Sequence, residues 1–249
     1  MEILPGVHLV DNVVMPGPGG NRSFNVGLLV EGTTITVIDA GPPGSEKTIC
    51  EYVRRIGYSL SHVRRVILTH HHVDNTGGLA GLVKLTGVEV WAHKDDACFI
   101  DGSEARPVEE LSPERIRAFM PAATAGQIVA VRTWMTEFMR TRPTNVDQRL
   151  CGGEELVALG GCRIVHTPGH TPGHICLYVP ARSLLIAGDL LRYEQLHKWQ
   201  RLISCSSWHI EAGDSLRRVA GLPFEAMYGY HGMFLAAGAG RLVNALLVE

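Results

Sequence analysis

The chain lacks the cysteine pattern, the long apolar runs and the export signal that mark several large classes of protein. Its six cysteines are scattered and form no Cys-x-x-Cys pair, which argues against a zinc ribbon or a thioredoxin-like site. No apolar run approaches the ~20 residues of a membrane helix, and Met1–Gly6 has neither the basic region nor the apolar core of a signal peptide. We therefore expect a cytoplasmic protein with buried thiols and no membrane partner.

A strong charge of one sign is also missing. The chain has 23 basic and 25 acidic residues, and its net charge is −2. Its basic runs are no longer than the arginine pairs at 54–55, 64–65 and 217–218, so the sequence shows no electrostatic footprint for nucleic acid. With 249 residues and 45% hydrophobic composition, the chain is long enough to bury a sizeable core. We expect a single domain over residues 1–249.

The most informative stretch is Thr69–Gly78, THHHVDNTGG, which follows the apolar run Val66–Leu68. In extended or loop backbone, residues two apart point the same way, so His70, His72 and Asp74 can face one point. Imidazole and carboxylate groups are good metal ligands. The spacing therefore predicts that two imidazoles and a carboxylate converge on one metal ion, or divide between two adjacent ions.

Three later stretches also end an apolar run with glycine and a metal-capable side chain. Ile164–His174 contains two Pro-Gly pairs, whose rigid turns fix the direction of His170. Leu184–Asp189 is an apolar run that ends in Gly-Asp, and Tyr228–Gly232 contains His231 between two glycines. Four apolar strands with the same kind of ending predict one metal centre at the ends of the strands.

Together these residues resemble the metallo-β-lactamase fold superfamily. Its signature is His-x-His-x-Asp-His, followed by a single His, a bridging Asp and a last His, and the resemblance runs from about Asn25 to Gly232. The resemblance implies that the first metal is bound by His70, His72 and His170. For the second metal it implies Asp74 and His231, with Asp189 bridging the two ions and Asn75 at the position of the family's fourth histidine.

Asn75 departs from the family pattern, because an amide oxygen is a weaker and harder ligand than imidazole. The other donors of the second site are compatible with zinc, manganese or iron. We therefore expect zinc, as one or two ions, and a second site that binds more weakly than the first. Asp39 is expected to support the ligands by hydrogen bonding. Three neighbouring histidines are not expected to bind metal: His71, His166 and His174.

The expected elements alternate between strand and helix, which implies sheets covered by helices. The resemblance implies an α/β fold, an αβ/βα sandwich of two face-to-face mixed sheets with helices outside. Ser45 is expected to cap a helix that ends near Ile56, and Asp214 to begin one that ends near Leu222. From about 99 to 150, apolar residues at helical spacing predict a helical insert that packs on the core, or forms a lid, a pocket wall or a homodimer surface.

A zinc-type ion lowers the pKa of bound water to about 7 and polarises a carbonyl oxygen. We expect a metal-bound hydroxide, oriented by Asp74 and Asp189, to cleave a lactone, an ester or a related acyl bond of a small molecule. Asp74 is expected to transfer the proton to the leaving group. The resemblance to lactonases of this superfamily implies that Tyr193, shortly after Asp189, assists the substrate carbonyl.

Two other enzymes remain as alternatives to this lactonase-like hydrolase. One is a glyoxalase II-like thioester hydrolase, although the 18 residues after His231 are fewer than the glutathione-binding domain of that branch requires. The other is a mononuclear iron enzyme similar to the sulfur dioxygenases. A non-enzymatic metal-binding protein is disfavoured, because six of the seven ligand positions match the family.

Overall fold

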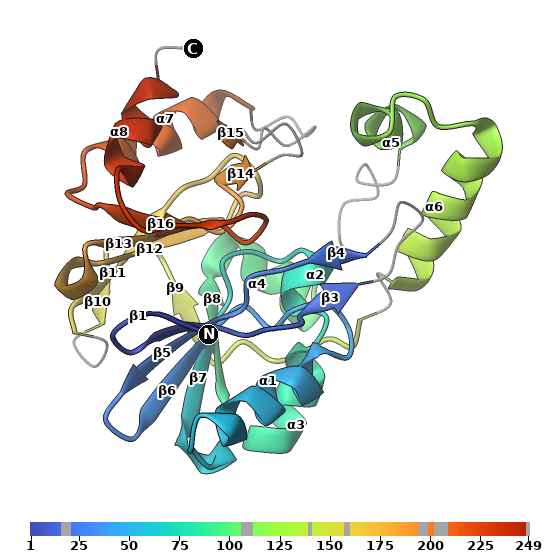
Figure 1. Cartoon of the computed structure of the whole chain (residues 1–249). Helices are drawn as coiled ribbons and strands as arrows, with labels where there is room; N and C mark the ends of the chain where they lie inside the picture. Colours follow the sequence, from blue (N-terminus) through green and yellow to red (C-terminus); the bar gives the residue numbers. More distant parts are fainter. Residues whose placement is uncertain are drawn as a thin grey trace.

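Two β-sheets face each other in the computed structural model, and helices cover the outer face of each (Figure 1). The structure describes residues 1–15, 21–105, 112–138, 141–156, 160–193, 199–201 and 209–247. The expected αβ/βα sandwich is confirmed. Within the described ranges, no helix combines the length and the apolar character that a membrane crossing needs.

The first sheet has seven strands in the order β1-β2-β5-β6-β7-β8-β9. Their bounds are β1 Glu2–Leu4, β2 Val7–Leu9, β5 Gly27–Glu31, β6 Thr34–Ile38, β7 Val63–Ile67, β8 Glu89–His93 and β9 Gln148–Leu150. Strands β6 to β9 are parallel to one another, so their C-terminal ends meet at one edge. The histidine stretch leaves β7 at that edge. Helices α1 (Ser45–Arg55) and α3 (Leu79–Thr86) pack on the outer face.

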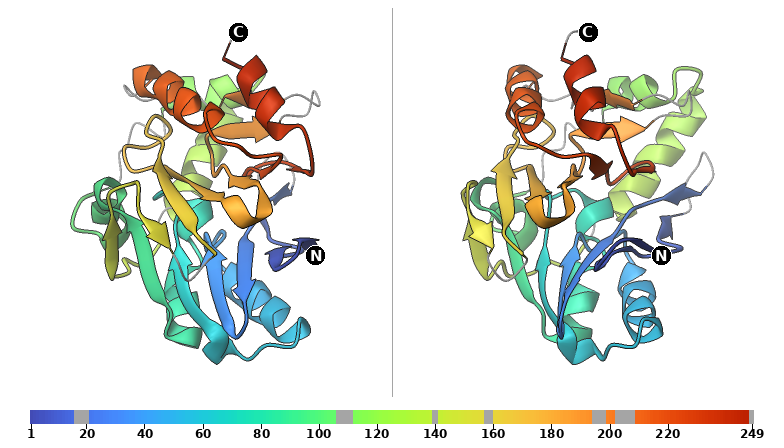
Figure 2. Two further views of the ribbon diagram at one scale, coloured as in Figure 1. Left: turned by 90° about the vertical axis from the view of Figure 1, so that its left-hand side faces the viewer. Right: turned by 60° about the vertical axis from the view of Figure 1, so that its left-hand side comes forward.

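The second sheet has six strands in the order β10-β11-β12-β13-β16-β17. Their bounds are β10 Glu155–Leu156, β11 Cys162–His166, β12 Ile175–Val179, β13 Leu184–Ile186, β16 Ala226–Tyr228 and β17 Phe234–Leu235. Helices α7 (His209–Ala220) and α8 (Ala239–Ala245) cover its outer face, as the two further views show (Figure 2). Two hairpins lie apart from both sheets: β3 (Val14–Met15) with β4 (Arg22–Ser23), and β14 (Leu191–Tyr193) with β15 (Trp199–Arg201).

The central strands bury apolar side chains on both faces. In β7, Val66 packs with the helices α1 and α3, whereas Ile67 packs into the core between the two sheets. In β12, Leu177 lies in the core between the sheets and Cys176 lies under α7 and α8. A strand that is buried on both faces has a continuous run of apolar residues in its sequence. The apolar runs before the metal-capable residues therefore predict strands well.

The expected helical insert forms α5 (Pro113–Phe119) and α6 (Ala125–Phe138), after α4 (Lys94–Asp101). The pair α5 and α6 has a small core of its own, made by Ile116, Ile128 and Val131. In Figure 1 the two helices, drawn in green, stand to one side of the sandwich. The chain then returns to the first sheet as β9, within the range predicted as insert.

Two predicted helix starts are wrong. Helix α1 is capped by Gly44, at a left-handed φ of 94°, and Ser45 is its first helical residue with no side-chain cap. Helix α7 begins at His209, five residues before Asp214. The Asp214 carboxylate lies 2.5 Å from Arg217 Nη2 on the surface of the helix, so it forms an ion pair one turn along the helix and does not cap an end.

Candidate metal centre

Three histidines from two strand ends come together where the two sheets meet. His70 and His72 follow β7, and His170 lies in the loop between β11 and β12. One ligand-capable atom of each lies within 4.8 Å of the other two, and His170 Nε2 is 3.0 Å from His72 Nδ1. These are the three residues predicted for the first metal.

Asp189 lies between this group and the residues predicted for the second metal. Its Oδ2 is 3.9 Å from His70 Nε2 and 3.3 Å from His170 Nε2. The same oxygen is 3.3 Å from His231 Nε2, which is also 3.3 Å from Asp74 Oδ2. Asp189 therefore lies between the two groups of side chains, where the resemblance implies a bridging carboxylate.

The charge balance of these residues suits a cation. Burial lowers the pKa of His231, but Asp189 and Asp74 outweigh burial and raise it to about 9. Burial would raise the pKa of both carboxyls, yet the nearby histidines hold both below their usual range. His70 Nε2 and Asp189 Oδ1 are buried without a hydrogen-bond partner. Unsatisfied buried atoms of this kind fit a bound metal, which would take up their lone pairs.

Asn75 is fully buried and belongs to the layer behind the ligands. Its Nδ2 donates a hydrogen bond to Thr69 Oγ1 at 3.3 Å, and its Oδ1 is buried with no hydrogen-bond partner. The amide nitrogen is thus directed at Thr69, which also binds Asp39. Asp74, Asp189 and His231 remain as the donors of the second position.

Asp39 and Thr69 fix the orientation of His70. Asp39, in a left-handed conformation with φ 62°, accepts hydrogen bonds from the Thr69 N–H at 2.8 Å and from its hydroxyl at 2.9 Å. Because that hydroxyl donates its one proton to Asp39, it accepts from His70 Nδ1, 3.1 Å away. The proton on Nδ1 leaves Nε2 with its lone pair facing Asp189, as a metal ligand requires. The predicted supporting role of Asp39 agrees with this geometry.

His174 fixes Asp189 in the same way. Its Nε2 accepts the Asp189 backbone N–H at 2.9 Å, and its Nδ1 lies 2.8 Å from Thr167 Oγ1. Burial, and then the charge of His170, lower the pKa of His174 to about 3, so the ring is neutral. Gly188 approaches this ring so closely that a Cβ atom would lie 2.7 Å from His174 Nε2. The glycine of the Gly-Asp ending is therefore required for packing.

Asp96 is a supporting residue that the sequence does not reveal. It is fully buried at the start of α4, and its Oδ2 accepts hydrogen bonds from the His71 N–H at 2.9 Å and the Thr171 hydroxyl at 2.7 Å. Its Oδ1 accepts the Gly173 N–H at 2.6 Å. One carboxylate thus ties the loop with His72 to the loop with His170. Only its place in the fold distinguishes this residue from other aspartates.

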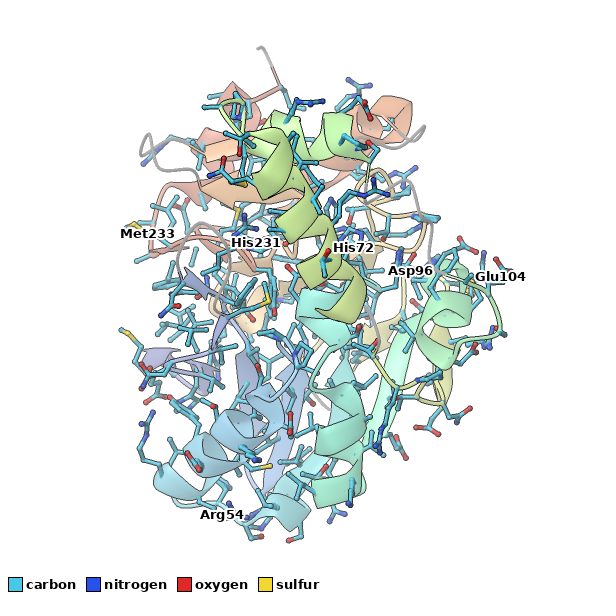
Figure 3. The ribbon with its side chains drawn as sticks, turned by 90° about the vertical axis from the view of Figure 1, so that its right-hand side faces the viewer. Arg54, His72, Asp96, Glu104, His231 and Met233 are labelled. Atoms are coloured by element: carbon cyan, nitrogen blue, oxygen red, sulfur yellow. The ribbon has the colours of Figure 1, made fainter. Side chains whose placement is uncertain are left out.

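The centre is open on one side. The exposed fraction of the Asp74 side chain is 24% and that of His231 is 15%, against 3% for Asp189 and 0% for His70. Figure 3 views the molecule from this side and shows α6 crossing in front of the region of His72 and His231. Tyr193 is the last residue of β14, but its side chain lies outside the described residues. Of the two carboxylates, Asp74 is therefore the one that solvent reaches.

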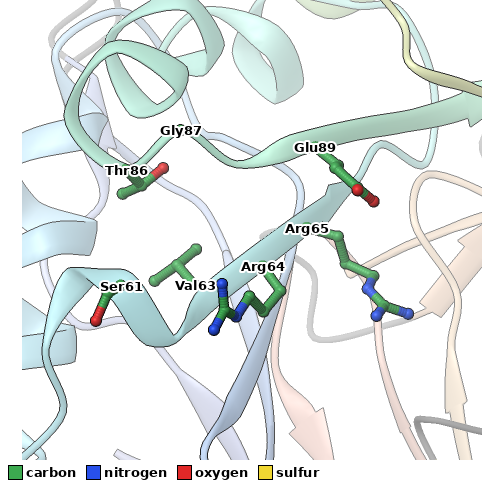
Figure 4. Close-up of a pocket in the computed structure, with 7 residues that line it drawn as sticks. All are labelled: Ser61, Val63, Arg64, Arg65, Thr86, Gly87 and Glu89. Carbon is green, nitrogen blue, oxygen red and sulfur yellow. The ribbon is translucent and has the colours of Figure 1, made fainter.

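A separate pocket of about 380 Å³ lies at the other end of the first sheet (Figure 4). It is lined near the N-terminal ends of β7 and β8 by Ser61, Val63, Arg64, Arg65, Thr86, Gly87 and Glu89. The metal-capable residues follow the C-terminal ends of these parallel strands. The pocket therefore takes no part in the candidate metal centre.

Comparison with known proteins identifies the family. A sequence model of the metallo-beta-lactamase superfamily matches residues 19–231. The chain belongs to this superfamily. Two similar proteins of Bacillus subtilis (strain 168) are both described as probable metallo-hydrolases. YflN is 28% identical over 84% of this chain and 80% of its own length, and YqjP is 30% identical over 66% of this chain and 51% of its own length.

A third relative is a hydroxyacylglutathione hydrolase of Albidiferax ferrireducens, 28% identical over 60% of this chain and 41% of its own length. The chain thus spans about half the length of YqjP and less than half the length of this hydrolase.

Two solved structures share the metallo-beta-lactamase fold. TTHA1429 of Thermus thermophilus has a TM-score of 0.71 at 22% identity and covers 99% of this chain and 80% of its own. TTHA1623 in a di-iron-bound form has a TM-score of 0.61 at 24% identity. The match covers 88% of this chain and 90% of the TTHA1623 chain.

The role of Thr69 can be tested by changing it to valine, which has the shape of threonine but lacks the hydroxyl. Thr69→Val removes the hydroxyl between Asp39 and His70, so we expect zinc affinity to fall by about 10- to 100-fold in a competition titration against a chelator. Thr86→Val is the control, because its hydroxyl donates to the Leu82 carbonyl within α3. Equal zinc affinity in Thr69→Val and the wild type would show that this hydroxyl does not orient His70.

The low pKa of the buried Asp96 carboxyl makes the free energy of unfolding depend on pH in acid. Burial would raise its pKa, but the charge of His71 and hydrogen bonds from His71, Thr171 and Gly173 lower it to about 2 from 3.8. The unfolded carboxyl therefore takes up a proton first, and the stabilisation present above pH ~4 is lost as the pH falls to ~2. Over that range, the free energy of unfolding of the wild type should fall by about 2 kcal/mol more than that of Asp96→Asn. Urea unfolding at a series of pH values measures the difference, and parallel curves would contradict it.

Proposed function

We propose that this chain is a metal-dependent hydrolase that cleaves a lactone, an ester or a related acyl bond of a small molecule. The observation that supports this most directly is the shared Asp189 oxygen, with His170 on one side and His231 and Asp74 on the other. Bound there, a zinc-type ion would supply a hydroxide at neutral pH and polarise the substrate carbonyl. Membership of the superfamily and the probable metallo-hydrolases among the relatives agree with this chemistry.

The residues at the open side would bind the substrate and transfer the proton. Asp74 is the most exposed of the carboxylates, and its depressed pKa keeps it ionised, so it would accept a proton and pass it to the leaving group. Asp189 and His70 are enclosed and would only hold the metal. Tyr193, in the segment that follows Asp189, is the proposed donor to the substrate carbonyl. Asn75 would add at most a weak ligand.

The insert would select the substrate. Helix α6 crosses in front of the region of His72 and His231 in Figure 3, and its exposed side chains are of mixed character: Val129 and Ala130 are apolar, whereas Gln127, Arg132 and Thr133 are polar. A helix of this kind would form a wall beside a small acyl substrate, or would contact a second copy in a homodimer. The thioester alternative has support from the similar hydroxyacylglutathione hydrolase. The structure of TTHA1623 contains two iron ions, whereas the iron alternative for this chain has one.

The function can be tested with a substrate panel and elemental analysis of the same preparation. We expect one or two zinc ions per chain and measurable kcat/KM on lactones or esters, with Asp74→Asn lowering kcat by about 10²- to 10⁴-fold. Asp214→Asn changes an exposed carboxylate of α7 that pairs with Arg217 and with none of the residues of the centre, so it should leave kcat unchanged. Hydrolysis confined to glutathione thioesters would favour the second candidate. A single iron without hydrolysis of any acyl substrate would overturn the proposal.

Because residue 75 is asparagine, we predict that the two metal positions differ in their affinity for zinc. Asn75→His restores an imidazole at the position of the family's fourth histidine, so we expect the second zinc ion to bind about tenfold more tightly or better. Calorimetric titration of zinc into metal-free protein separates the two binding steps. Identical second-step affinities in the two proteins would mean that residue 75 does not limit the second position.

A further inference from the structure

The loop that contains His231 is held by Asn25, a residue from the other half of the sandwich. Asn25 lies just before β5 of the first sheet, whereas His231 follows β16 of the second sheet. The Asn25 amide donates two hydrogen bonds through Nδ2, to the carbonyl oxygens of Gly229 and Gly232, and each is 2.8 Å long. These carbonyls lie on either side of His231 in the chain. One amide group therefore closes the short loop around this histidine.

The backbone of Asn25 makes a third contact with the same loop. Its N–H donates to the Tyr230 carbonyl oxygen at 3.0 Å. Three of the four residues from 229 to 232 therefore direct their carbonyl oxygens at Asn25. Gly232 has a φ of 139°, which L side chains rarely adopt, so the turn after His231 requires glycine.

Two aromatic rings enclose the imidazole of His231. The Phe24 ring meets it edge to face with centroids 5.3 Å apart, and the Tyr230 ring does so at the same distance. Both aromatic side chains are buried. Tyr230 also donates its hydroxyl proton to the Asp74 carbonyl oxygen. Tyr230 thus joins the segments of two donors of the second metal position, and Phe24 and Asn25 hold one of them from the first sheet.

The position of His231 needs support because its loop is rich in glycine. Glycine has more backbone freedom than any other residue, and fixing that freedom when a metal binds costs entropy. His231 Nε2 must also point at one place, since it lies 3.3 Å from both the Asp74 and the Asp189 carboxylates. The hydrogen bonds of Asn25 restrict the loop on both sides of the imidazole, so they restrict where Nε2 can lie.

We propose that Asn25 is a positioning residue for the second metal: it holds the loop so that His231 Nε2 faces Asp74 and Asp189. This inference deepens the proposed function, because it rests on His231 as a donor of the second metal position. The first position has a separate support, since Thr69 and Asp39 orient His70. The action of Asn25 is therefore confined to the second position.

Calorimetric titration of zinc into metal-free, full-length protein tests this role. Asn25→Ala removes the amide, and Asn25→Leu replaces it with an apolar group of similar shape; both variants keep the backbone N–H that binds Tyr230. We expect the second zinc ion to bind about 10- to 100-fold more weakly in each variant, with the first step unchanged. A role in stability alone would lower the Tm and leave the ratio of the two affinities as it is in the wild type.

The matched control is Asn244→Ala. Asn244 is exposed in α8, and its Nδ2 likewise donates to a glycine carbonyl, that of Gly240, at 2.8 Å. Both zinc steps of this variant should equal those of the wild type. Circular dichroism of the metal-free proteins verifies that the variants fold. Unchanged affinity for the second zinc ion in both folded Asn25 variants would overturn the proposal.

Crystal structures of the metal-free wild type and Asn25→Ala give a second measurement, which also decides the case in which titration resolves only one zinc step. In the variant, His231 Nε2 should move away from Asp189 Oδ2, from which it is 3.3 Å in the wild type. An unmoved His231 would then overturn the proposal. Failure of the proposed function is distinguishable, because a protein that hydrolyses no acyl substrate can still lose second-step zinc affinity with Asn25→Ala.

Discussion

The buried Asp189 carboxylate is the contact on which the centre depends. It follows β13 of the second sheet, and one of its oxygens lies 3.3 to 3.9 Å from His70, His170 and His231. A carboxylate with an exposed fraction of 3% is unfavourable unless positive charge lies beside it. The histidines that meet this need come from both halves of the sandwich. The requirement to neutralise one buried charge therefore also fixes how the two sheets face each other.

A layer of hydrogen bonds behind the ligands gives each of them one orientation. Asp39 and Thr69 set the tautomer of His70, and His174 holds the backbone of Asp189. Asp96 ties together the two loops that contain ligands. Because these supports are buried, their hydrogen bonds act at low dielectric and lose little to solvent. These hydrogen bonds would thus reduce the ordering that metal binding requires of the ligands.

The sequence predicted which metal-capable side chains lie together because each of them follows a local pattern, whereas the sandwich was implied by the resemblance to the superfamily. Each metal-capable residue follows an apolar run that is buried on both sides, and that pattern is visible without tertiary information. Asp96 was not predicted, because nothing in its neighbours Lys94 and Asp95 distinguishes a buried carboxylate from an exposed one. The start of α7 was misplaced because Asp214 looks like a cap but pairs with Arg217. Such pairings depend on which face of an element is covered, which composition does not encode.

Helix α4 and the loop after β11 each contact two groups of histidines. Asp95 and Asp96 are adjacent, yet successive residues of a helix point about 100° apart, so one faces His93 and the other faces His71. His166 lies at the end of β11 next to the Pro172 carbonyl, and His170 lies in the loop that follows. Asp96 binds Thr171 and Gly173 of the same loop, so its carboxylate holds in place more than the residues that face the centre.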